Sequence, residues 1–186
     1  MERSRRQFLL GGLKRLNRAK KEASRKKETT LEFLLRPPGA IAEKAFLQTC
    51  NKECLQCLTA CPFHAIQKVG DSLSPAYLTA YIDPDISGCS FCKDFPCIEA
   101  CGYGALSAEI GPLSRAVVTA SCITRQGEFC EICMTSCPPD HQSITKDKKG
   151  IFRIDPKTCV GCGSCVSACY LTPKAIEIHP TDRQVP

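Results

Sequence analysis

Residues 159–169 read Cys159-Val-Gly-Cys162-Gly-Ser-Cys165-Val-Ser-Ala-Cys169, a run in which four cysteines are separated by two, two and three residues. The chain has 186 residues and sixteen cysteines, and these fall into four groups that all end with the same three-residue gap. Such a repeat indicates that a whole unit of the fold is duplicated, and not the cysteines alone. The groups are the first motif (Cys50, Cys54, Cys57, Cys61), the second (Cys89, Cys92, Cys97, Cys101), the third (Cys122, Cys130, Cys133, Cys137) and the fourth (Cys159, Cys162, Cys165, Cys169).

The composition leaves little material for a large core of side chains. Tryptophan is absent and aromatic residues make up 6% of the chain, so something besides apolar packing must hold the fold together. Disulfides would suit a secreted chain, but the N-terminal sequence lacks the apolar core of an ordinary secretory signal peptide. No run approaches the ~18 apolar residues of a membrane span. We therefore expect the cysteines to bind metal.

The spacing of the cysteines selects the kind of metal centre. Three thiolates separated by two residues each can surround one iron-sulfur cube, and the fourth, three residues further on, reaches a neighbouring cluster, as in two-cluster bacterial ferredoxins. Proline after the last cysteine of a motif, at Pro62 and Pro138, favours the turn by which the chain leaves the cluster. The sequence therefore predicts four [4Fe-4S] clusters with all sixteen cysteines as ligands.

Two pairings of the motifs are open. The first motif can share clusters with the second and the third with the fourth, or the pairs can be nested, first with fourth and second with third. Ile-Asp-Pro sequences at 82–84 and 154–156, just before the second and fourth motifs, favour the consecutive pairing. Its four ligand sets are Cys50, Cys54, Cys57 with Cys101; Cys89, Cys92, Cys97 with Cys61; Cys122, Cys130, Cys133 with Cys169; and Cys159, Cys162, Cys165 with Cys137.

The predicted fold class is α+β, with two tandem bacterial 2[4Fe-4S] ferredoxin-like modules in which two-stranded sheets and short helices surround the clusters. Residues 65–69, 116–119 and 150–154 predict short strands between the cysteine loops. The predicted domains are a basic N-terminal extension (1–30), a first module (31–110), a second module (111–180) and a tail (181–186).

Two other metal chemistries fit the pattern less well. Zinc sites usually take two ligands from each of two separated knuckles, whereas every motif here packs at least three cysteines within twelve residues. The spacing of the first three cysteines of the first motif is also that of a radical S-adenosylmethionine site. Cys61 then offers a fourth ligand, however, and the barrel of such enzymes does not fit in this chain beside three further motifs.

Catalysis by a free thiol is not indicated. A nucleophilic cysteine needs a nearby base, and the three histidines, His64, His141 and His179, are expected to lie in turns, in a loop or in the tail. No glycine-rich nucleotide-binding loop occurs. We therefore predict an electron-transfer protein without catalytic residues.

The N-terminal segment is strongly basic. Residues 1–28 carry eleven Lys or Arg and three Glu, a net +8, so residues 29–186 sum to −2 in a chain of +6. Sixteen thiolates around four oxidised clusters would bring that body to about −10. Ser4–Leu10 matches the twin-arginine export motif, but the apolar stretch that should follow it is missing. The apolar residues between positions 8 and 16 share one helical face, which suits a membrane surface or a partner protein; solvation is the third option, and nucleic acid is not expected.

The sequence also resembles a known family. Leu35–Ile41, read Leu-Arg-Pro-Pro-Gly-Ala-Ile, with the Cys89-Ser-Phe-Cys92-Lys-Asp-Phe-Pro-Cys97 motif and the seven-residue gap from Cys122 to Cys130, resembles the MauM/NapG ferredoxins over about residues 31–180. These are iron-sulfur subunits that accompany periplasmic nitrate reductase and methylamine-utilisation systems. The resemblance implies an electron-transfer subunit with four [4Fe-4S] clusters, whose partners are a polytopic membrane ferredoxin that oxidises quinol and a terminal reductase.

Two functions follow as hypotheses. The first is a polyferredoxin that relays single electrons through four clusters between a membrane donor and a terminal reductase. The alternative is an accessory protein for iron-sulfur cluster assembly or maturation of a molybdenum reductase. We expect a cytoplasmic protein, with membrane contact through residues 1–28 as an option and export to the periplasm through Ser4–Leu10 as the alternative.

Overall fold

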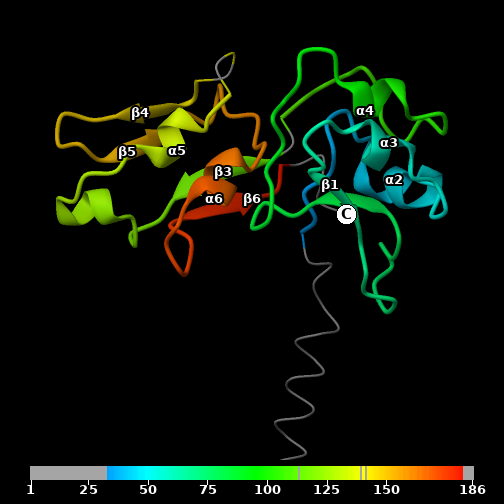
Figure 1. Cartoon of the computed structure of the whole chain (residues 1–186), viewed down its shortest axis with the longest axis horizontal. Coiled ribbons are helices and arrows are strands. Elements are labelled where there is room, and N and C mark those ends of the chain that lie inside the picture. The colour runs from blue at the N-terminus through cyan, green and yellow to red at the C-terminus, as the bar shows by residue number, and fades with distance from the viewer. Residues whose placement is uncertain (1–32, 113, 139, 141, 182–186) are drawn as a thin grey trace, which may run out of the picture. The chain divides into compact units, whose positions relative to one another are not determined.

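The computed structural model describes residues 33–112, 114–138, 140 and 142–181, and the chain divides into a unit up to Phe33 and a second unit from Leu34 onward. The basic N-terminal extension and its twin-arginine-like motif therefore lie outside the described residues. All elements of the second unit are short, as Figure 1 shows. They are α2 (Glu43–Thr49), α3 (Gln56–Ala60), β1 (Ile66–Lys68), β2 (Ala80–Ile82), α4 (Pro96–Glu99), β3 (Arg115–Val118), the 3₁₀ helix η1 (Ile123–Gln126), α5 (Ile132–Thr135), β4 (Ile144–Lys146), β5 (Phe152–Ile154), α6 (Ser164–Ala168) and β6 (Ile176–His179).

One hairpin separates the two cysteine motifs within each half of this unit. In the N-terminal half, residues 33–112, antiparallel β1 and β2 pair with Ile66 opposite Ile82 and lie between the first and second motifs. In the C-terminal half, residues 114–181, β4 and β5 pair with Ile144 opposite Ile154 and lie between the third and fourth motifs. Strands β1, β3 and β5 coincide with the predicted strands to within one or two residues. Each Ile-Asp-Pro sequence begins at the last residue of a strand, because proline does not continue the ladder.

In each half, the segment before the first of its two motifs also pairs with the segment after the second. Strand β3, which precedes the third motif, pairs antiparallel with β6, which follows the fourth motif. In the N-terminal half the equivalent segments form a single antiparallel bridge between Ala40 and Leu106. Both halves therefore join a segment before one motif to a segment after the next motif. His179 is the last residue of β6 and not part of the tail as predicted; His64 is exposed in a turn with φ of 50°, and His141 lies outside the described residues.

Cysteines form part of the buried core. In the C-terminal half, a core cluster contains Ile144, Phe152, Val166 and Ile176 together with three cysteines, Cys133, Cys159 and Cys165. Because most elements span only three to five residues, each offers few apolar side chains to a core. Among the described residues, no helix is both long and apolar enough to cross a bilayer.

Gly39 allows the closing bridge of the N-terminal half. Its φ is +74°, its carbonyl accepts a hydrogen bond from the N–H of Ser107 at 2.7 Å, and an added Cβ would lie 2.1 Å from the carbonyl oxygen of Ser107. We expect Gly39→Ala to cost more than about 1 kcal/mol of stability, because alanine disfavours positive φ and has no space here. Gly70→Ala is the control, since an added Cβ meets nothing within 4 Å. Equal thermal midpoints of the two variants, measured by circular dichroism, would contradict this account.

Candidate iron-sulfur sites

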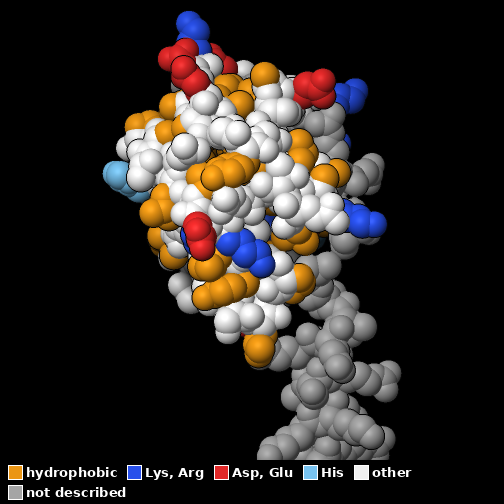
Figure 2. All heavy atoms as spheres, turned by 90° about the vertical axis from the view of Figure 1, so that its right-hand side faces the viewer, with side chains coloured by type: hydrophobic (Ala, Val, Ile, Leu, Met, Phe, Trp, Pro, Cys, Tyr) orange, Lys and Arg blue, Asp and Glu red, His pale blue; other side chains and the backbone are white. Residues whose placement is uncertain are grey.

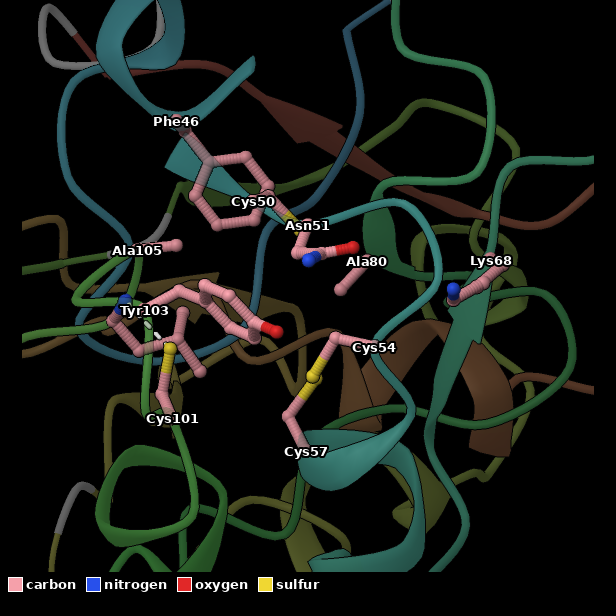
Figure 3. A pocket seen from close by; sticks show the side chains of 11 residues that line it. Phe46, Cys50, Asn51, Cys54, Cys57, Lys68, Ala80, Cys101, Tyr103 and Ala105 are labelled. Carbon is pink, nitrogen blue, oxygen red and sulfur yellow. Dashed lines mark hydrogen bonds between the residues drawn. The ribbon is translucent and has the colours of Figure 1, made fainter. Parts of the chain in front are cut away.

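The first group of cysteines, which we call site A, surrounds a small cavity in the N-terminal half. Cys50, Cys54, Cys57 and Cys101 line it, and Figure 3 shows Cys50 beside the ring of Phe46 and the other three cysteines on the far side of Tyr103. The remaining lining is mostly apolar, with Ala80, Ala105 and Leu106.

Local structure explains how these cysteines are presented. Cys50 is the C-cap of α2, and its N–H donates to the carbonyl of Phe46 at 2.8 Å. Because Cys50 ends a helix, the extra residue before Cys54 is accommodated in the following turn. Cys57 lies in α3, and Cys101 follows the C-cap of α4. The first motif thus supplies three cysteines and the second supplies one.

The second group, site B, has the complementary composition. Cys61, Cys89, Cys92 and Cys97 line one cavity. Cys61 is the C-cap of α3 and Cys97 lies in α4, so α3 and α4, which pack together, each carry or precede ligands of both sites. The motif also contains strained backbone: Phe91 and Phe95 have φ of 50° and 41°, and their rings meet edge to face at 5.1 Å.

The C-terminal half repeats this arrangement. Cys137, Cys159, Cys162 and Cys165 line one cavity, which we call site D. The last group, site C, consists of Cys122, Cys130, Cys133 and Cys169. Cys122 and Cys169 belong to one buried cluster. Cys122 and Cys130 lie close enough to Cys133 for their charges to raise its pKa. The gap between Cys122 and Cys130 is filled by η1. These groupings follow the consecutive and not the nested pairing, while ligation itself stays a prediction.

Backbone amides point at several of the sulfurs. The N–H of Ala65 donates to Sγ of Cys61, that of Leu106 to Sγ of Cys101, and that of Phe91 to Sγ of Cys89, each at 3.4 Å. The bond from Leu106 is the dashed line in Figure 3. Hydrogen bonds to the sulfurs are one of the ways in which a protein sets the potential of an iron-sulfur cluster.

Several of the cysteine thiols have a raised pKa and are disfavoured as free anions. Burial raises the pKa of Cys57 and of Cys89 to about 12, and nearby thiolates add to the effect. Burial likewise raises the pKa of Cys97 and of Cys133 to about 11 and raises that of Cys165 further still. Metal ligands must be deprotonated, so a cationic group at each site has to compensate four neighbouring thiolates.

The donor set fits a [4Fe-4S] cluster. Each site offers four cysteine sulfurs, which is the complete ligand set of a cubane, and at sites A, B and D they line an apolar cavity. In the part of the chain that the structure describes, no three Cys, His, Asp or Glu side chains are placed to hold a single metal ion. A zinc ion needs its sulfurs about 2.3 Å from one centre.

A buried ion pair supports site A. Arg36 is 0% exposed and pairs with Glu43 through two contacts, Nε to Oε2 at 2.9 Å and Nη2 to Oε1 at 2.5 Å. Its Nη1 donates to the hydroxyl of Thr79 at 3.0 Å and to the carbonyl of Ala80 at 2.7 Å. The guanidinium also stacks over the ring of Phe46 at 4.7 Å. Arg36 thereby ties α2, β2 and a wall of site A together.

Sequence reasoning did not single out this pair. The only sequence feature that could have indicated the ion pair is the presence of a cation and an anion seven residues apart, on either side of a Pro-Pro-Gly sequence. Nothing local relates them to Thr79, which is far along the chain. Lys68, which lines site A beside Cys54 and donates to the carbonyl of Lys52, was missed for the same reason.

Comparison with known proteins identifies the family. A model of the 4Fe-4S dicluster domain matches residues 127–171, which hold seven cysteines of the third and fourth motifs. The methylamine utilization ferredoxin-type protein MauM of Methylobacillus flagellatus is 33% identical over 168 aligned residues, covering 80% of this chain and 69% of MauM. The ferredoxin-type protein NapG of Escherichia coli is 33% identical over 167, covering 78% and 70%. The chain belongs to the MauM/NapG family of ferredoxin-type proteins.

Membership of the MauM/NapG family confirms the resemblance seen in the sequence. MauM of Paracoccus denitrificans gives a similar match, 32% identical over 162 residues, covering 80% of this chain and 72% of that protein. This MauM/NapG-type chain is thus an iron-sulfur protein with [4Fe-4S] clusters and an α+β, ferredoxin-like fold. It is an electron carrier and not an enzyme.

Proposed function

We propose that this protein holds four [4Fe-4S] clusters in two tandem ferredoxin modules and relays single electrons between redox proteins. The observation that carries the proposal is the repeated division of ligands, in which each of sites A to D takes three cysteines from one motif and one from its consecutive partner. Each half has its own hairpin and its own closing pair, which supports the proposed modules 31–110 and 111–180.

The protein's own residues set the conditions at each site. A bound [4Fe-4S] cluster supplies a one-electron couple whose potential depends on burial, charge and hydrogen bonds. Cys159, Cys162 and Cys165 of site D are 7–8% exposed, whereas all four cysteines of site A are only partly buried. The cysteines of site A are therefore more accessible to water than three of the four cysteines of site D.

Site A is also flanked by exposed apolar side chains. Leu55, just before α3, is 54% exposed, and Tyr103, which lines the cavity, is 52% exposed; Phe63, which lines site B, is 55% exposed. Figure 2 shows hydrophobic side chains scattered among acidic and basic ones on one face of the molecule. Aromatic side chains are enriched at protein interfaces, so we assign docking of a redox partner to the surroundings of site A.

The family suggests what those partners are. The MauM relatives are named for methylamine utilization, and the resemblance implies a polytopic membrane ferredoxin as donor and a terminal reductase as acceptor. We propose that the basic residues 1–28 dock the protein to such a membrane partner on the cytoplasmic side. Deleting them should move the protein from the membrane fraction to the soluble fraction. Unchanged fractionation of the deletion variant, and of a second variant with the export motif mutated, would contradict that assignment.

Metal analysis tests the proposed function. Protein purified without oxygen should contain about sixteen iron atoms and sixteen acid-labile sulfides per chain, as four cubanes require. Dithionite should produce the EPR spectrum of interacting reduced clusters, reversibly on reoxidation. About eight iron per chain would overturn the four-cluster reading. Transfer of a cluster to an apo-reductase, without rapid reversible reduction, would instead support the accessory role in maturation.

A further inference from the structure

We propose that electrons cross between the two halves at one contact, formed by Gly88 and Cys89 of the second motif and by Cys162–Ser164 of the fourth. The clusters are then used in the spatial order A, B, D, C, and not in the order of the motifs along the chain. This inference rests on the proposed four-cluster function. It adds which sites adjoin and which residues join them.

Hydrogen bonds connect ligand residues of the two halves directly. The N–H of Cys89 donates to the carbonyl of Cys162 at 2.8 Å. In the opposite direction, the hydroxyl of Ser164 donates to the carbonyl of Cys89 at 2.8 Å, and the same hydroxyl oxygen lies 3.6 Å from Sγ of Cys162. The backbone of a site B cysteine is thus hydrogen-bonded directly to the backbone of a site D cysteine.

The contact is possible because glycine stands on both sides of it. A Cβ on Gly88 would lie 2.3 Å from the backbone nitrogen of Ser164 and 2.5 Å from the carbonyl carbon of Gly163. The N–H of Gly88 donates to the hydroxyl of Ser167 at 3.2 Å. Gly163 has φ of +81°, and a Cβ there would be 2.9 Å from Cβ of Pro84. Any side chain at position 88 would push the two loops apart.

Within each half, neighbouring sites are already linked by shared helices. Helix α3 carries Cys57 of site A and is capped by Cys61 of site B. Helix α6 carries Cys165 of site D and is capped by Cys169 of site C. The contact between the halves adds the missing link, between B and D. A bound cluster at each site would supply a one-electron couple, so that an electron crossing there would raise the oxidation state of the donor centre by one and lower that of the acceptor centre by one.

Two-cluster variants test the order by EPR, which reports magnetic interaction independently of electron-transfer activity. Cys54→Ala with Cys130→Ala removes sites A and C and leaves B and D. Cys61→Ala with Cys130→Ala leaves A and D, and Cys61→Ala with Cys137→Ala leaves A and C. The B/D variant should show split signals of interacting clusters, whereas the A/D and A/C variants should show separate, unsplit signals. A split A/D or A/C spectrum beside an unsplit B/D spectrum would overturn the proposed order.

Gly88→Ala tests the contact in the intact chain, with Gly70→Ala as the matched control. Gly88→Ala should retain all its iron but lose the EPR splitting that arises from the interaction of sites B and D. Gly70→Ala should retain both the iron and this splitting. Unchanged splitting in Gly88→Ala would refute the role of the contact, and this comparison also decides the matter if a two-cluster variant loses its remaining iron. Low iron in the unaltered protein would instead reject the proposed function itself.

Discussion

The variants Cys54→Ala and Cys101→Ala should lose the same cluster. Each lacks one ligand of site A, so each is expected to lose about four of sixteen iron atoms. The double variant Cys54→Ala/Cys101→Ala should lose no more than either single variant. Cys97→Ala/Cys101→Ala, with both changes in the second motif, should lose about eight, because Cys97 belongs to site B. Iron and sulfide analysis of the anaerobically purified variants gives the result.

This comparison separates the consecutive pairing from its rivals. If each motif ligated a cluster by itself, Cys97→Ala/Cys101→Ala would lose about four iron and Cys54→Ala/Cys101→Ala about eight. The nested pairing makes Cys101 share a site with the third motif, so that Cys54→Ala/Cys101→Ala would again lose two clusters. Circular dichroism of each variant serves as the control for general unfolding.

Arg36→Met should be among the most destabilising changes outside the cysteines. It leaves the Glu43 carboxylate, whose side chain is 11% exposed, without its bidentate partner. Removing one member of a buried pair typically costs about 3–5 kcal/mol. It also removes the stacking on Phe46, a wall of site A. We expect a lower thermal midpoint and faster bleaching of the visible iron-sulfur absorbance on warming.

Two further variants show whether the ion pair is the cause. Arg36→Met/Glu43→Gln should recover part of the loss, because no charge is then left without a partner. Arg153→Met is the matched control, since Arg153 is 71% exposed at the side chain and its ion pair with Asp147 lies at the surface. Equal effects of Arg36→Met and Arg153→Met on the midpoint would contradict the assigned role.

The division of each motif into three cysteines and one was predictable because it depends on short chain segments, whereas the pairing of the motifs was left open. Two or three residues between cysteines fix how far each thiolate reaches, so the division of Cys57 and Cys61 between neighbouring sites follows from spacing. The hairpins were partly predictable as well. Apolar residues next to Ile66 and Ile154 mark strands, and the Ile-Asp-Pro sequences mark where they end.

Contacts between distant segments were not predictable in this way. Gly88 and Ser164 are separated by a large part of the chain, and a glycine that must fit against a backbone looks in the sequence like any other glycine. The same holds for Arg36 and Thr79. β3 was recognisable as a strand, but β6 was not, because Ile176–His179 alternates charged and apolar residues over only four positions. Its strand character depends on pairing with β3, which supplies the hydrogen bonds.

The helices that carry ligands for two sites have a consequence for oxidative damage. If oxygen destroyed a cluster at site A, the thiol of Cys57 in α3 would lose its metal, and the same helix ends at Cys61, which lines site B. Oxidative damage that begins at site A should therefore reach site B sooner than it reaches the C-terminal half. No cysteine serves sites on both sides of the glycine contact between the halves. The C-terminal half should therefore keep its clusters after those of the N-terminal half are lost.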